Sequence, residues 1–253
     1  MAHTYSFIKH PSSRNPKKQT ANLNLAAFIL CTICSFFVKL AIRAGDSLFI
    51  RSPVVSILSF FCIITPMQLG QKFFNQPTVD LAKALLGKYL VCGNLKGKIV
   101  ETEAYLYHDD PGCHASRGQT PRNTPMFGPA GRTYVYFIYG MYHCLNIVSG
   151  KTGEGEAVLI RALEPIEGIE LMQKRRKTTK IENLCNGPGK LTQAFGITRK
   201  HNNMSLIDGK LRIHNSREKP EIVCDRRIGL SVGKELELRF YIKGNRFVSK
   251  TPS

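Results

Sequence analysis

The chain has 253 residues, of which 43% are apolar and 21% charged, and this ordinary globular composition excludes a collagen-like or wholly disordered protein. Its 36 basic and 18 acidic residues give a formal charge of +18. A field of this sign raises the local concentration of polyanions, so nucleic acid or an anionic lipid surface is the expected partner.

The eight cysteines are scattered, and they do not form the two closely spaced pairs of a zinc site. Cys31 and Cys34 are two residues apart, but they lie in an apolar stretch, where thiols pack as small hydrophobic groups. The cysteines therefore indicate reduced, intracellular thiols.

Composition changes sharply near Met67. Before it, seven basic residues accompany a single acid, Asp46, and the apolar stretches 25–42 and 54–64 are divided by a polar break. This pattern fits a signal peptide, a signal anchor or an organellar targeting segment, and a gene-model error is the alternative. Either interpretation places residues 1–66 outside the catalytic domain. Residues 67–253 still carry 29 basic and 17 acidic residues, a net charge of +12. Most of the positive charge is therefore on the expected folded domain.

The first element expected in that domain is a short amphipathic helix over residues 77–86. Leu81 and Leu85 fall on one helical face, Asp80 lies near the positive N-terminal end, and Gly87 is placed to end the helix.

Strands are expected next. Residues 88–91 and 97–102 are short β-branched stretches, and alternating apolar and tyrosine residues around Gly140 predict a pair of strands over 132–148.

Two helices and a closing strand complete the pattern. Ile166, Ile169 and Met172 have helical spacing and predict a helix over 165–176. A second short helix is expected over 189–195, and one or two strands over 239–248. With no repeat or long linker after Met67, residues 67–253 are predicted to form one α+β domain, much of it antiparallel sheet.

The segment VETEAY ends a predicted strand with two carboxylates, Glu101 and Glu103. Side chains alternate along a strand, so both are expected on the same face. Such a pair is ordinarily a solvated strand face. Here, however, His114 follows in a loop and a tyrosine-rich segment comes next, so one carboxylate is a candidate catalytic group.

Tyrosines gather on and near the predicted strand pair: Tyr105, Tyr134, Tyr136, Tyr139 and Tyr142. They suit a pocket that stacks a flipped nucleobase, because every base offers a π-face, and they also suit a tyrosine-rich sheet core. The break at Gly140 would expose Tyr139 as a wedge that fills a gap in a base stack.

Several longer motifs resemble those of the alkyladenine (3-methyladenine, methylpurine) DNA glycosylase family: VETEAY, TPRN, MFGPAGRTYVYFIYGMYHCLN, AVLIRALEP and LCNGPGKL, together with His114. The resemblance runs from about Met67 to the C-terminus. It implies a base-excision-repair enzyme that flips alkylated or deaminated purines out of duplex DNA, hydrolyses the N-glycosidic bond and leaves an abasic site. It also implies a curved antiparallel β-sheet with flanking helices and a protruding β-hairpin, like a formyltransferase C-terminal domain.

The resemblance assigns the catalytic roles to two residues. Glu103 would be the general base that activates a water, and Arg161 would help to hold that water. Cleavage passes through an oxocarbenium-like state, which a nearby carboxylate stabilises. Glu101 would then be a structural partner that faces solvent or a basic neighbour, although the sequence leaves the reverse assignment open.

The resemblance also describes the base pocket. Tyr105 and Tyr136 would lie on either face of the flipped base, with His114 nearby, and Asn146 would act as a filter against normal guanine. A core tyrosine pair, a structural histidine and a capping asparagine are the alternatives.

The expected hairpin tip would contact the DNA stack. Tyr139 matches the residue that enters the minor groove and takes the vacated position, and Met141 and Tyr142 would flank it. Candidates for phosphate contacts are Arg122, Lys190, Arg226 and Arg227. The turn at 187–189 before a helix would also offer N–H groups to a phosphate.

The resemblance implies no metal or other cofactor. His108, Asp109, Asp110, Cys113 and His114 form a metal-like cluster in sequence, but a solvated acidic turn is the simpler interpretation. No lysine falls at an amine nucleophile's position in these motifs, so abasic-site lyase activity is not expected.

The partners expected are duplex DNA, bound through the minor groove by a monomer, and the enzymes that next process abasic sites. One alternative is a catalytically silent damage-binding protein, and another is a membrane-anchored basic protein attached through residues 1–66. A nucleobase deaminase is excluded because its zinc signature is absent. The expected compartment is the nucleus, with the mitochondrion as the alternative.

Overall fold

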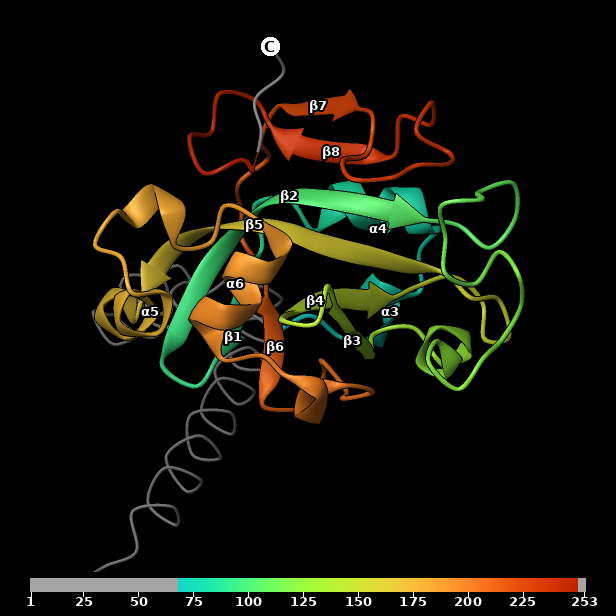
Figure 1. Ribbon diagram of the computed structural model, residues 1–253, viewed down its shortest axis with the longest axis horizontal. Helices are drawn as coiled ribbons and strands as arrows, with labels where there is room; N and C mark the ends of the chain where they lie inside the picture. Colours follow the sequence, from blue (N-terminus) through green and yellow to red (C-terminus); the bar gives the residue numbers. More distant parts are fainter. Residues whose placement is uncertain (1–67, 250–253) are drawn as a thin grey trace, which may run out of the picture. The chain divides into compact units, whose positions relative to one another are not determined.

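The computed structural model describes residues 68–249 (Figure 1). The predicted targeting or anchoring segment in residues 1–66 lies outside the described residues, as do Cys31 and Cys34. Within 68–249, no helix combines the length and apolar character needed to cross a bilayer.

An antiparallel sheet of eight strands organises the described fold: β1 (Tyr89–Cys92), β2 (Leu95–Tyr105), β3 (Thr133–Ile138), β4 (Tyr142–Val148), β5 (Ala157–Glu167), β6 (Leu211–His214), β7 (Ile222–Asp225) and β8 (Arg239–Ile242). The strand order is β3-β4-β5-β2-β1-β6, and β8 pairs with both β2 and β7. The long strands β2 and β5 run side by side through the middle of this unit (Figure 1). The α+β class with a curved antiparallel sheet is thus confirmed.

Short helices connect and cover the strands: α3 (Gln71–Phe74), α4 (Thr78–Ala84), α5 (Ile169–Arg176), α6 (Pro188–Phe195) and the 3-10 turns η2 (Thr124–Phe127), η3 (Ile181–Asn183) and η4 (Arg199–His201). The two helices α4 and α6 were predicted within a residue or two of their ends. In α6, proline occupies the first turn and Gly196 ends the helix with a φ of 69°.

Alternation along the central strands separates the main core from the site. Val135, Leu145, Ile147, Val158 and Ile160 point to one face, where they pack with the apolar sides of α4 and α6. The residues between them point to the other face, where they line a cavity: Tyr134, Tyr136, Cys144, Asn146, Leu159 and Arg161. In strands β3 to β5, therefore, one set of alternate residues packs in the core and the other set lines a candidate site.

One edge of strand β2 pairs with two different strands in turn. Its first residues pair with β1, and Glu101, Thr102 and Glu103 pair with β8. On the opposite edge the register with β5 shifts, because Glu101 pairs with Ala162 while Thr102 pairs with Ile160. Such irregularities redirect side chains, and this one lies where both carboxylates of VETEAY are found.

Two predicted boundaries were wrong, and two short strands were not predicted. The helix expected over 165–176 begins at Ile169, because β5 continues through Glu167 and Gly168 turns the chain with a φ of 77°. A side chain at Gly168 would place a Cβ 2.4 Å from a methyl carbon of Leu95, so this turn requires glycine. The closing strand ends at Ile242 rather than 248, and the four-residue strands β6 and β7 were not predicted.

Candidate active site

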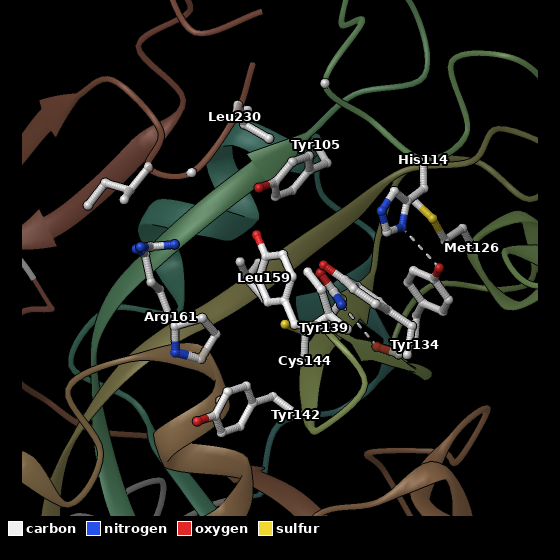
Figure 2. Close-up of a pocket in the computed structure, with 18 residues that line it drawn as sticks. Tyr105, His114, Met126, Tyr134, Tyr139, Tyr142, Cys144, Leu159, Arg161 and Leu230 are labelled. Atoms are coloured by element: carbon white, nitrogen blue, oxygen red, sulfur yellow. Dashed lines mark hydrogen bonds between the residues drawn. The ribbon is translucent and has the colours of Figure 1, made fainter. Parts of the chain in front are cut away.

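A cavity of about 340 Å³ opens on the face of the sheet opposite the main core (Figure 2). Its strand residues are Tyr105 at the end of β2 and the alternate residues of β3, β4 and β5 described above. Other parts of the chain complete the wall: His114 and Met126, Pro188 and Gly189 at the start of α6, and Ile228 to Leu230 after β7. The volume is within the usual range for small-molecule sites, about 300–1,000 Å³.

Glu103 lies directly behind this wall, and its side chain is fully buried. One oxygen, Oε1, accepts a hydrogen bond from the backbone N–H of Ile228 at 2.8 Å and lies 3.3 Å from Nη1 of Arg161. The other, Oε2, accepts a hydrogen bond from the Tyr105 hydroxyl at 2.9 Å. All three partners line the cavity, so the carboxylate lies immediately next to the cavity wall.

The protonation of Glu103 depends on opposing influences. Burial is the largest, and it raises the pKa of Glu103 above its ordinary value. The Arg161 guanidinium, the Ile228 N–H and the Tyr105 hydroxyl act in the opposite direction and favour the ionised form. A carboxylate has about four lone-pair sites, so these three contacts leave an acceptor position for a water. This environment suits a proton acceptor whose pKa is above the usual range for glutamate.

The four predicted pocket residues meet at the cavity: Tyr105, His114, Tyr136 and Asn146. His114 packs edge-on against the Tyr136 ring at 4.6 Å, and burial lowers its pKa, which keeps the imidazole neutral at pH 7. The Asn146 amide is buried and donates to the backbone oxygen of Tyr134 at 3.1 Å. Their convergence was predicted, whereas their roles toward a base stay predictions.

The hairpin between β3 and β4 presents large apolar side chains to solvent beside this cavity. Tyr139 is 77% exposed and Met141 is 63% exposed, and Tyr142 next to them is also exposed. Tyr139 and Tyr142 both line the cavity (Figure 2). Tyr139 adopts a φ of 53°, which is rare for a bulky residue and points to a functional constraint. The exposed tip thus agrees with the sequence prediction.

The four candidate phosphate contacts have different surroundings. Arg122 and Arg226 are exposed, and the Arg122 guanidinium lies 5.3 Å from the centre of the Tyr136 ring, beside the cavity. Lys190 is partly exposed and donates to Asn186 at 2.8 Å. The prediction for Arg227 was wrong, because its side chain is buried against Asp110, as described next.

Arg227 and Asp110 form a buried ion pair that the sequence did not predict. Nη2 of Arg227 lies 2.5 Å from one Asp110 oxygen, and Nη1 lies 2.6 Å from the other. The guanidinium also lies 4.7 Å from the centre of the Tyr105 ring, so it supports a wall of the cavity. Asp110 was expected in a solvated turn, but it also accepts backbone N–H bonds from Leu106 and Gly112 at 3.0 Å.

Glu101 is fully buried, which corrects the alternative in which it faces solvent. It has the basic neighbours that the other alternative required: Nε of Arg239 donates to its Oε1 at 2.6 Å, and Nε of Arg161 lies 3.3 Å from the same oxygen. Arg161 therefore lies between the two carboxylates of VETEAY. All three partners of Glu103 line the cavity, whereas Glu101 is also held by Arg239, which does not, and this difference supports the predicted choice between them.

Comparison with known proteins gives a consistent result. Residues 72–246 match the family model described as Methylpurine-DNA glycosylase (MPG). A Methanoculleus marisnigri protein named "Putative 3-methyladenine DNA glycosylase" is 50% identical over 192 residues, which cover 73% of this chain and 100% of the relative. A Francisella tularensis protein of the same name is 52% identical over 182 residues, covering 68% and 94%. A third, from Prosthecochloris aestuarii, is 51% identical over 187 residues, covering 70% and 89%.

Proposed function

The chain belongs to the methylpurine-DNA glycosylase family, and on this premise we propose that it excises alkylated or deaminated purines from duplex DNA and leaves abasic sites. One observation carries the proposal: a buried carboxylate, Glu103, lies behind a tyrosine-lined cavity with a guanidinium 3.3 Å away. This arrangement provides a base and a positive charge next to a space for a flat aromatic molecule.

The chemistry follows from the charge that develops during cleavage. As the bond between the anomeric carbon and the purine nitrogen breaks, the sugar becomes oxocarbenium-like. Ionised Glu103 offsets this positive charge and takes a proton from the attacking water, whose oxygen forms the new bond to carbon. Arg161 keeps Glu103 ionised and donates a hydrogen bond to the water. The purine leaves with the electrons of the broken bond, and the sugar–phosphate backbone stays intact.

Base selection takes place in the cavity. Tyr105 and Tyr136 stack on the flipped base, and an electron-poor alkylated purine gains most from these ring faces. Neutral His114 forms part of the pocket wall without adding a charge. The fixed amide of Asn146 excludes the exocyclic amino group of guanine. Asn146 is buried with its amide bonded to the Tyr134 carbonyl, and the His114 ring shares a hydrogen bond of 3.1 Å with the Tyr134 hydroxyl. These contacts support the proposed roles, because a filter must not move aside.

The hairpin tip keeps the flipped state open. Tyr139 enters the minor groove and fills the space that the base vacates, while Met141 and Tyr142 contact the neighbouring bases. The exposure of Tyr139 and its place at the cavity edge support this role. The formal charge of +12 on residues 67–253 attracts the DNA backbone, and Arg122 and Arg226 are exposed candidates for phosphate contacts.

Excision from defined duplexes tests the proposal. Full-length protein in excess is mixed with duplexes that contain hypoxanthine, ethenoadenine or 3-methyladenine, and abasic sites are revealed by alkali. We expect strand breaks only after alkali and only with a damaged base. Glu103→Gln should be inactive, and Glu167→Gln, a substitution of an exposed carboxylate on β5, should retain the wild-type rate. Breaks before alkali would contradict simple hydrolysis, and tight binding without excision would favour the damage-binding alternative.

A further inference from the structure

The last described residues of the chain contact the candidate active site from behind. The Ser249 hydroxyl accepts a hydrogen bond from Nε of Arg161 at 3.1 Å and donates one to Oε1 of Glu101 at 3.0 Å. The backbone N–H of Ser249 donates to Oε2 of Glu101 at 2.7 Å. Ser249 therefore links the guanidinium beside Glu103 to the second buried carboxylate.

These contacts divide the Arg161 guanidinium into two sides. Its Nε side faces Ser249 and Glu101, and its Nη1 faces Glu103. Glu101 is itself fixed by Nε of Arg239, which donates to it at 2.6 Å. Because a guanidinium is planar, fixing the Nε edge also fixes the direction in which the opposite nitrogens point.

The segment 245–249 is attached to the same strand that carries Arg161. The side-chain nitrogen of Asn245 donates to Glu164 at 3.0 Å, and Phe247 is buried against Ala162 of β5 and Val100 of β2. These anchors lie one and three residues beyond Arg161. The packing of segment 245–249 against β5 and β2 therefore fixes the position of Ser249 next to Arg161.

The backbone gives Arg161 less regular support than its neighbours receive. In the pairing of β2 with β5, Glu101 is opposite Ala162 and Thr102 is opposite Ile160, so the register shifts at Arg161 itself. A long side chain at such a position needs side-chain contacts to select one direction.

We propose that Ser249 and Glu101 are positioning residues, which hold the Nε edge of Arg161 so that its Nη1 faces Glu103 and the attacking water. This inference rests on the proposed glycosylase function and deepens it. The C-terminal segment acts through Arg161 and does not contact the DNA lesion itself.

The test compares Ser249→Ala with Ser249→Thr, which keeps the hydroxyl. The second control is Ser216→Ala, which removes a hydroxyl that accepts a hydrogen bond from the backbone N–H of Glu218, away from the cavity. Single-turnover excision rates and lesion-duplex dissociation constants are measured on full-length protein. We expect Ser249→Ala to excise about tenfold more slowly, which is the loss of one charge-assisted hydrogen bond, with a dissociation constant within about twofold of wild type. Ser249→Thr should recover most of the rate, and Ser216→Ala should match wild type.

A double-variant cycle separates positioning from general structure. If Ser249 acts through Arg161, adding Ser249→Ala to Arg161→Gln should cause no further loss of rate. The acid limb of the rate profile should also move to higher pH in Ser249→Ala, because a displaced Arg161 stabilises ionised Glu103 less well.

Two results would overturn the inference: equal rates for wild type and Ser249→Ala, or the same tenfold loss with and without Arg161. Absence of excision by wild type would instead refute the proposed function, so the two failures are distinguishable.

Discussion

Replacing Glu103 by glutamine removes its charge while nearly preserving its shape. The glutamine oxygen can still accept the Ile228 N–H, and the new amide can donate to the Tyr105 hydroxyl. Arg161 keeps its contact with Glu101 at 3.3 Å. The substitution therefore removes the proton acceptor and leaves the walls of the cavity in place.

The expected loss of rate follows from the role of a general base. Positioned acid–base groups contribute about 10²- to 10⁴-fold, and Glu103 also loses its effect on the oxocarbenium charge. The single-turnover excision rate should therefore fall by at least about a thousandfold, toward the upper part of that range. The dissociation constant for lesion duplex should stay within about threefold, because Glu103 is fully buried behind the wall.

The stability of the same variant has a predictable sign. Burial raises the pKa of Glu103 despite three favourable contacts, so the ionised side chain costs the folded state free energy at neutral pH. Glutamine removes that cost. The melting temperature should therefore not fall, and a gain of about 1 kcal/mol would appear as an increase of about 2–4 °C.

Excision kinetics, lesion binding by fluorescence anisotropy and thermal unfolding on one preparation provide the three measurements. A wild-type excision rate in Glu103→Gln would refute the assignment of the base. A loss of rate accompanied by lost binding and a lower melting temperature would instead show that Glu103 supports the fold.

Three further predictions concern pH, the hairpin tip and the buried ion pair. Because the folded pKa of Glu103 is raised, the excision rate should fall on acidification at a pH above the ordinary glutamate value of about 4.3, and a rate that stays flat down to that pH would contradict this. Tyr139→Asn should weaken lesion binding at least about tenfold without lowering the melting temperature, since asparagine tolerates the left-handed backbone and a stacked aromatic contributes about 1–3 kcal/mol; unchanged binding would exclude a wedge. Asp110→Asn should lower the free energy of unfolding in urea by about 3–5 kcal/mol, because it leaves the buried Arg227 guanidinium without its counterion, and a change below about 1 kcal/mol would show that the pair contributes little.

Local sequence patterns predicted the elements that local forces determine. The hairpin around Gly140 was predicted because alternation and a turn signal occur together within 17 residues, and α4 and α6 have apolar faces with proline or glycine near their ends. The boundary between β5 and α5 was missed because Ile166 fits both periodicities. What decides it is the close approach of Gly168 to Leu95, a contact between segments far apart in sequence.

Some features of the candidate site were likewise predicted from the sequence, and others were not. The motifs indicated which side chains gather at the cavity, because the family resemblance assigns pocket positions to residues that are far apart in sequence. They did not indicate which of the adjacent arginines, Arg226 or Arg227, is buried, because Arg227 is placed by an aspartate 117 residues earlier. Nor did spacing show that Glu101 is enclosed by Arg239 and Ser249, which reach it only when β8 and the following segment pack against β2 and β5.

The pairing of β8 with the second half of β2 has a consequence for the order of folding. Glu103 receives its backbone donor from Ile228, and Glu101 receives Arg239, so the residues that complete the site emerge late in synthesis. A nascent chain that ends before Ile228 lacks the N–H donor to Glu103, the Arg239 partner of Glu101 and the strand that pairs with the second half of β2. The two carboxylates of VETEAY therefore reach the surroundings seen here only after nearly the whole described domain has been synthesised, because Arg239 and Ser249 come last.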